Sequence, residues 1–84
     1  MARVLFRGDA AKFARDELPA KDLSPQADGS VVARVRVASE VWFLSWLFQY
    51  GSGAEVLDPP ELREAVRRTC RQVLDYYAQR PPGR

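Results

Sequence analysis

The sequence predicts an α+β fold in which strands and helices follow the order βαββαβ, with one further helix at the C-terminal end. Three observations lead to this prediction. The chain has 84 residues, 46% of them hydrophobic, which is enough for one small domain with one core. Residues 30–37 alternate in polarity as a β-strand does. A Gly-rich junction at residues 49–64 separates two helical patterns and leaves room for a short strand between them.

The first strand and the first helix are read from the N-terminal residues. In residues 2–7 the apolar Ala2, Val4 and Phe6 alternate with Arg3, Leu5 and Arg7, which favours a strand. Gly8 and Asp9 interrupt this strand, and Asp9 is suited to cap a helix that runs to about Leu18. Pro19 ends the helix, because the residue before a proline disfavours helical angles. The residues of this helix that are expected to face the core are Ala10, Phe13, Ala14 and Leu18.

Two more strands are predicted to form a hairpin. Residues 21–27 are polar and are predicted to form an edge strand, because Pro25 has no N–H group to donate to a neighbouring strand. Asp28 and Gly29 indicate a tight turn. Residues 30–37, with the sequence Ser-Val-Val-Ala-Arg-Val-Arg-Val, are the clearest strand of the chain.

The second helix is predicted over residues 40–50, with Ser39 as its N-cap and Glu40 in its first turn. Its core stripe is assigned to Phe43, Leu44, Leu47 and Tyr50. Apolar side chains also cover most of the remaining circumference of this helix, which is typical of a helix buried on more than one side. A domain of this size has too small a core to cover them all, so Trp42 and Trp46 are expected to form an interface with a partner.

The junction after this helix is predicted from its glycines and its acidic residues. Gly51 and Gly53 end the helix, and residues 54–57 form a short strand. Asp58 is predicted to cap the last helix in a capping box with Glu61, and the two prolines between them fit the first turn.

The last helix is predicted from Pro60 to about Gln79. Residues 1–79 are therefore assigned to one domain, and residues 80–84 to a disordered tail. The predicted core stripe of this last helix consists of Leu62, Val66, Cys70, Val73 and Tyr77, with the cysteine as a small buried apolar side chain.

Composition excludes several classes of function. The chain has no histidine and one cysteine, so an internal disulfide is excluded, and no metal site or cofactor is expected. Without histidine the usual general base is missing, and we expect no catalytic residues and no enzyme activity. No run of 18 apolar residues and no secretion signal is visible, which predicts a cytoplasmic protein without membrane contact.

The basic residues, eleven Arg and two Lys, suit bidentate binding of phosphate or carboxylate. In the ferredoxin-like arrangement that the order of elements matches, the first and third strands are neighbours in a four-stranded antiparallel sheet, and the helices cover one face. Strand alternation places Arg3 and Arg7 on one face of the first strand, and Arg34 and Arg36 on one face of the third. Four guanidinium groups are thus expected to gather on the face that no helix covers.

Three interpretations of this arginine face remain open. It binds an anionic ligand or nucleic acid, it binds an acidic protein surface, or it is a solvated sheet face whose arginines reach Glu55 or an acidic loop. The outward positions of the two strands hold no aromatic residue, which argues against a surface that stacks bases by itself.

The pattern G-x-x-V-x-x-P-x-x-L-R recurs in the junction as Gly51, Gly53, Val56, Pro59 or Pro60, Leu62 and Arg63. Together with the order of elements over residues 2–77, this pattern makes the chain similar to the WCX domain. That domain is the C-terminal extension that follows the WYL domain in bacterial transcription regulators. The resemblance implies ligand sensing and dimerisation, with nucleic-acid ligands in members that respond to DNA damage. Arg63 falls on the motif in the first turn of the last helix, where it is expected to complete an anion pocket.

The resemblance also implies partners for this chain. They are the WYL and helix-turn-helix domains upstream in a parent chain, a second copy in a homodimer, and single-stranded nucleic acid or another anionic effector. The predicted function is a non-catalytic regulatory module that senses such an effector and contributes to dimerisation. The alternative is a module for dimerisation or protein interaction alone, held by the aromatic helix, with no ligand of its own.

Overall fold

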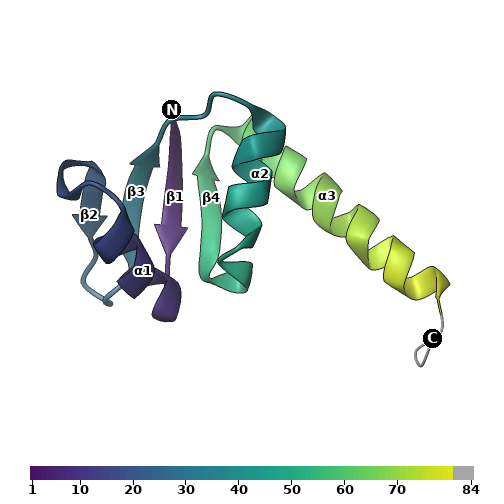
Figure 1. Cartoon of the computed structure of the whole chain (residues 1–84), viewed down its shortest axis with the longest axis horizontal. Coiled ribbons are helices and arrows are strands. Elements are labelled where there is room, and N and C mark those ends of the chain that lie inside the picture. Colours follow the sequence, from purple (N-terminus) through teal and green to yellow (C-terminus); the bar gives the residue numbers. More distant parts are fainter. Residues whose placement is uncertain (81–84) are drawn as a thin grey trace.

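The computed structural model describes residues 1–80, so the predicted tail at residues 80–84 lies, apart from Arg80, outside the described residues. Four strands form an antiparallel sheet in the order β2-β3-β1-β4 (Figure 1). The strands are β1 (Ala2–Phe6), β2 (Leu23–Pro25), β3 (Val31–Val35) and β4 (Ala54–Asp58). The first and third strands are therefore adjacent, and the predicted ferredoxin-like arrangement is confirmed.

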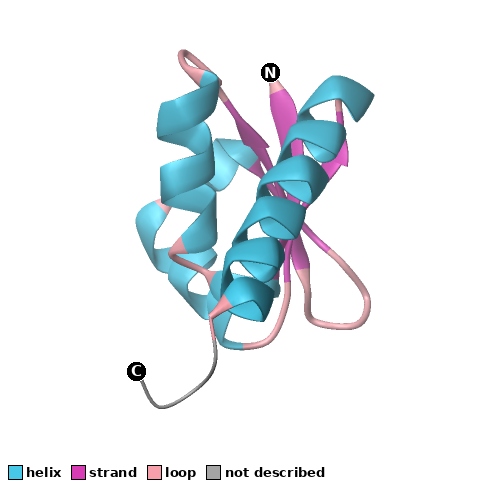
Figure 2. Ribbon diagram, turned by 90° about the vertical axis from the view of Figure 1, so that its right-hand side faces the viewer, coloured by secondary structure: helices cyan, strands magenta, loops and turns pink. Residues whose placement is uncertain are grey.

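Two helices, α1 (Asp9–Glu17) and α2 (Glu40–Phe48), lie on one side of the sheet (Figure 2). The third helix, α3 (Pro60–Gln79), starts at the β4 edge and runs away from the sheet (Figure 1). Two short 3₁₀ helices, η1 (Ala20–Asp22) and η2 (Gly51–Gly53), precede β2 and β4. Because α3 protrudes, the molecule is elongated, with dimensions of 45 × 25 × 19 Å.

The core lies between the sheet and the first two helices. Strand alternation turns every second side chain toward them, and Phe6 at the end of β1 is the largest fully buried side chain. Its ring packs edge-on against Tyr50, with centroids 5.1 Å apart, and against Trp46 at 6.1 Å. The other buried core residues are Ala2, Val4, Ala10, Ala11, Ala14, Val31, Ala33, Phe43, Leu47, Val56 and Leu62.

Helix α1 packs through small side chains, which differs from the prediction. Ala10, Ala11 and Ala14 are buried, whereas Phe13, predicted to face the core, is 56% exposed. The alanines let the helix approach the sheet closely, and this approach leaves no room for a phenyl ring on the same face. Asp9 is the first helical residue and not the cap; Gly8 occupies the cap position with a φ of 61°.

The hairpin between β2 and β3 forms where the sequence predicts it, although both strands are shorter than expected. The amide of Gln26 donates to the carbonyl of Ser30 at 2.8 Å and closes the turn around Asp28 and Gly29. Pro25 lies in β2, at the edge of the sheet as predicted. The predicted N-cap of α2 is also confirmed, because the Ser39 hydroxyl oxygen accepts from the amide of Trp42.

Helix α3 buries only its first turns. Leu62 and Ala65 are buried and Val66 is half-buried, but every residue from Cys70 to Arg80 is exposed. The predicted core positions Cys70, Val73 and Tyr77 are therefore wrong. The twenty residues of α3 extend for about 30 Å. The helix is therefore much longer than the five-residue strand β4 that precedes it.

The junction before α3 also differs from its prediction. Asp58 belongs to β4 and does not cap α3; Pro59 holds the cap position, with no side-chain hydrogen bond. Gly53 is required by packing, because a Cβ atom there would lie 2.6 Å from the Cβ of Ala10. Its carbonyl accepts from the amide of Arg7 at 2.8 Å, so the junction is fastened to the end of β1.

No helix within residues 1–80 has the length and apolar character needed to cross a membrane.

Candidate functional site

The sheet face opposite α1 and α2 carries a cluster of charged side chains, and we refer to it as the open face. Arg3 of β1 stands directly opposite Arg34 of β3 in the antiparallel register. Leu5 and Val32 form the next pair on this face and are half-buried. Side chains directly opposite each other in a sheet lie close enough to interact, so the two guanidinium groups repel each other unless anions balance them. The open face consists of Arg3, Leu5, Arg7, Val32, Arg34, Glu55 and Asp58.

Each arginine of the open face has a carboxylate partner in the structure. Arg3 pairs with Asp58 at 3.3 Å, and Arg34 pairs with Asp22 of η1 at 3.4 Å. Arg7 forms an ion pair with Glu55 and also donates to the carbonyl of Ser52. The side chains of Arg3, Arg7 and Arg34 remain about half exposed, at 54%, 48% and 61%. These pairs reduce the positive charge of the face without burying the arginines.

Glu55 joins the open face to the last helix. One of its carboxylate oxygens accepts from Arg7, and the other accepts from Arg63 at 3.1 Å. Arg63 lies in the first turn of α3 and also donates to the carbonyl of Val56 at 2.7 Å. The hydrogen bonds from Arg7 and then from Arg63 lower the pKa of Glu55 below its ordinary value of 4.5. The carboxylate is therefore ionised at neutral pH and holds β1, β4 and α3 together.

Replacing Glu55 with glutamine is expected to reduce stability at neutral pH and to have little effect in acid. A group with a lowered pKa contributes stability above its ordinary pKa, and this contribution is lost as the pH falls through the lowered value. For an exposed ion-pair network of this kind we expect the melting temperature to fall by about 2–5 °C at pH 7. Thermal unfolding followed by circular dichroism at pH 7 and pH 3 measures the difference.

Asp16→Asn is the matched control for this experiment, because Asp16 is exposed and forms no ion pair within residues 1–80. The control should not reproduce the pH-dependent difference. An equal loss of stability at both pH values in Glu55→Gln would contradict the assignment of the network.

The predicted site residues fall into two groups. Arg3, Arg7 and Arg34 come together on the open face, and Arg63 reaches it from α3 through Glu55. Arg36 lies beyond the end of β3 and lines a hollow formed with α1 and α2, on the helix side of the sheet. Of the predicted ligand-binding residues, Arg36 alone is separated from the rest.

The acidic partners Asp22 and Asp58 were not anticipated from the sequence. Arg3 faces Asp58, while its neighbour Val4 faces Val56, so Leu57 is an extra residue in β4. This bulge shifts Asp58 to the open face, whereas regular pairing would have put it on the core side. A bulge has no clear signal in the sequence, so strand alternation alone could not place Asp58 on the open face.

The two tryptophans of the predicted interface have different environments. Trp46 is half-buried and belongs to an aromatic cluster with Phe6, Phe43 and Tyr50, with a centroid distance of 5.3 Å to Tyr50. Trp42, one turn earlier on α2, is 73% exposed. Trp46 therefore contributes to the domain's own packing, and Trp42 remains available at the surface.

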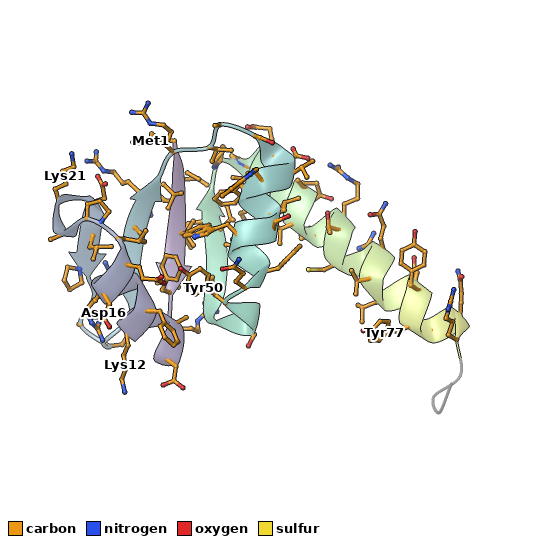
Figure 3. The ribbon with its side chains drawn as sticks, in the orientation of Figure 1. Met1, Lys12, Asp16, Lys21, Tyr50 and Tyr77 are labelled. Atoms are coloured by element: carbon orange, nitrogen blue, oxygen red, sulfur yellow. The ribbon has the colours of Figure 1, made fainter. Side chains whose placement is uncertain are left out.

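A second exposed apolar surface lies on α3, and we call it the α3 stripe. A hollow of about 530 Å³ is lined by Phe48 of α2 and by Cys70, Val73 and Leu74 of α3. Tyr77 is 79% exposed on the free half of the helix, far from Tyr50 over the sheet (Figure 3). The α3 stripe comprises Cys70, Val73, Leu74 and Tyr77. The 3.6-residue pattern identified most of these residues, but as core and not as surface.

Comparison with known proteins identifies relatives of the chain. The profile of the WCX domain matches residues 1–74. Two curated proteins, both named Protein PafC, from Mycobacterium tuberculosis strains CDC 1551 / Oshkosh and ATCC 25618 / H37Rv, are each 34% identical over 74 residues. The match covers 87% of this chain and 23% of each relative, so the chain spans less than a quarter of their length. No solved structure matches significantly.

Proposed function

The chain belongs to the WCX domain family, and from this premise we propose that it is a non-catalytic regulatory module that senses an anionic effector on its open face. The parent would be a transcription regulator that carries WYL and helix-turn-helix domains upstream of this module. The proposed effector is a short single-stranded nucleic acid, bound mainly through its phosphates. Effector binding would bias the geometry of a homodimer and hence its binding to promoters.

The observation that supports this proposal is the convergence of arginines from β1, β3 and α3 beside a sheet face that α1 and α2 leave uncovered. Each guanidinium has five N–H donors, and the internal ion pairs use only part of them. The carboxylates also hold the arginine side chains in place, which lowers the entropic cost of binding phosphate. Bases need aromatic surfaces for stacking, and none lies among these residues, so recognition of the backbone is favoured.

The internal carboxylates also limit the affinity of this face. Arg3, Arg7, Arg34 and Arg63 oppose Asp22, Glu55 and Asp58, which leaves one net positive charge in the cluster. A phosphate must compete with these carboxylates for the guanidinium groups. Binding by this chain alone is therefore expected to be weak and strongly dependent on salt, with additional contacts supplied by other domains of the parent.

The test is a titration of this chain with a fluorescently labelled single-stranded oligonucleotide at several salt concentrations. If four phosphates are contacted, the logarithm of affinity should fall against the logarithm of salt with a slope of about 3. The double variant Arg3→Ala, Arg34→Ala should reduce that slope to about 1.5, because two phosphate contacts are lost.

A matched double variant, Arg15→Ala with Arg80→Ala, removes the same charge from α1 and from the C-terminal end of α3, away from the open face. This control should retain the slope of the unmodified chain. If both double variants weaken binding equally, the interaction is a general charge effect and the open face is not the site.

A second candidate function, dimerisation, is favoured by the α3 stripe. The residues from Cys70 to Arg80 are all exposed, and they include Val73, Leu74, Tyr76 and Tyr77, which are 48–79% exposed. Large apolar side chains grouped on one protruding helix are typical of a protein–protein interface. Helix α2 also exposes Val41, Trp42 and Phe48, but α3 exposes more large apolar side chains and protrudes from the domain (Figure 1). We therefore place the dimer contact on α3 and not on the aromatic helix.

The sequence of α3 is compatible with antiparallel pairing to a second copy of itself. With a twofold axis between Arg71 and Gln72, Cys70 stands opposite Val73 of the second copy. The same axis brings Val66 opposite Tyr77, so the pairing is apolar along its length, as expected of an isologous contact.

A further inference from the structure

A hollow of about 480 Å³ opens on the helix side of the sheet, between the end of α1, the end of β3 and one side of α2. Its volume falls within the range of about 300–1,000 Å³ that is typical of small-molecule sites. The open face is on the other side of the sheet, so the hollow is a separate feature. The residues that line it include Leu18, Val35, Arg36, Trp42, Phe43 and Trp46.

The walls of this hollow are mainly aromatic. Trp42 and Trp46 are one turn apart on α2 and therefore point to the same side of the helix. Trp46 is held by the ring of Phe43 at 5.8 Å, which gives the hollow a fixed wall. Trp42 is 73% exposed and makes no aromatic contact within residues 1–80, so its indole face is available to a planar group.

Arg36 gives the hollow a positive charge. The arginines of the open face are each paired with a carboxylate, but Arg36 forms no ion pair and no side-chain hydrogen bond within residues 1–80. The nearest acidic residue in sequence, Glu40, lines a different hollow with Met1 and Val37. An unpaired guanidinium beside apolar walls is suited to an anion carried on an apolar molecule.

We propose that this hollow binds a small aromatic carboxylate. The aromatic ring lies against the indole groups of Trp42 and Trp46, and the carboxylate accepts two hydrogen bonds from Arg36. Ser39 contributes at the same end, because its hydroxyl oxygen accepts from the amide of Trp42 at 3.3 Å and its O–H group is left to donate.

The lining disfavours a nucleotide in this hollow. The edges of a nucleobase carry several hydrogen-bonding atoms that need partners when they leave water. Among residues 1–80, Arg36 and Ser39 supply the only charged or hydroxyl side chains of the lining, and both are engaged by the carboxylate in the proposed mode. This inference does not rest on effector binding at the open face, and Arg3→Ala with Arg34→Ala should leave it unchanged.

The experiment uses 3-phenylpropionate as the probe and the fluorescence of the protein as the signal. The chain has two tryptophans, Trp42 and Trp46, and both line the hollow, so excitation at a wavelength selective for indole reports on it directly. We expect a saturable change in emission with 3-phenylpropionate. The uncharged 3-phenylpropanamide and the variant Arg36→Ala should each bind about tenfold more weakly, because the charge-assisted hydrogen bonds are lost.

Arg15→Ala is the matched control, an exposed arginine of α1 outside the lining, and it should bind the probe as the unmodified chain does. Circular dichroism of each variant verifies that it is folded. The proposal is overturned if the amide binds as well as the carboxylate, if Arg36→Ala retains full affinity, or if the probe causes no saturable change. Tighter binding of adenosine monophosphate than of 3-phenylpropionate would also overturn it, in favour of a nucleotide site.

Discussion

Replacing Phe6 with alanine is expected to lower the free energy of unfolding by about 3–5 kcal/mol. Phe6 is fully buried at the end of β1, and its ring supports Trp46 and Tyr50 of the aromatic cluster. Its removal leaves a cavity that a small, rigid core cannot fill. Domains of this size have little stability to spare, so the variant should be largely unfolded at 37 °C. Urea unfolding followed by circular dichroism measures the loss.

Phe13→Ala provides the matched control for the same substitution on the surface. Phe13 is 56% exposed on α1, and its removal should cost less than about 1 kcal/mol. Phe6→Leu should fall between the two, because most of the buried apolar volume is kept. A loss in Phe13→Ala as large as that in Phe6→Ala would mean that α1 packs through its phenyl ring and not through its alanines.

The second large effect is expected on association. At high concentration the chain should form a dimer, and Leu74→Glu should weaken this dimer more than a hundredfold. Leu74 is 69% exposed and lines the hollow of the α3 stripe, so the substitution spares the core. In the dimer, however, it would place a carboxylate in an apolar contact, which is costly without a partner charge. Sedimentation velocity over a range of concentrations measures the dissociation constant.

Val41→Glu is the control for this prediction, because Val41 is 75% exposed on α2 and does not line that hollow. It should dimerise as the unmodified chain does. Dimerisation that is lost in Trp42→Ala but retained in Leu74→Glu would return the interface to the aromatic helix. A chain that stays monomeric at millimolar concentration would exclude α3 as a self-association surface.

Strand pairing was predictable from the sequence because alternation has a period of two and is easily read. Val4 and Phe6 in β1 and Val31 and Ala33 in β3 alternate with polar or partly exposed residues, and this fixes which face meets the helices. The order of elements then places β1 beside β3. The position of Arg3 opposite Arg34 follows from that pairing.

Helix burial was predicted less well, since an apolar stripe indicates a contact face but not what covers it. The stripe of α3 includes Leu62, which the domain buries, and Val73 and Tyr77, which it does not. In α1 the predicted core positions included Phe13 together with Ala10 and Ala14, and the close approach of the helix to the sheet buries the alanines and leaves Phe13 exposed. Such distances depend on the whole fold and not on the local pattern.

The arginines of the candidate site were predictable from the sequence, but their partners Asp22 and Asp58 were not. The positions of Arg3, Arg7 and Arg34 follow from the pleat of two regular strands. Asp58 reaches the open face through an irregularity in β4, and Asp22 reaches Arg34 from a 3₁₀ helix where an edge strand was expected. Pairing across irregular backbone depends on local geometry that residue spacing does not determine.

The first turn of α3 is fixed to the sheet, so a rotation of the helix at this point would be amplified at its other end. Arg63 links this turn to Glu55 and to the carbonyl of Val56, while the C-terminal end of the helix projects away from the domain (Figure 1). For a helix about 30 Å long, a rotation of about 10° at its first turn displaces its C-terminal end by about 5 Å. A partner bound to the C-terminal end of α3 would therefore be displaced by a small rearrangement around Glu55, without itself contacting the sheet.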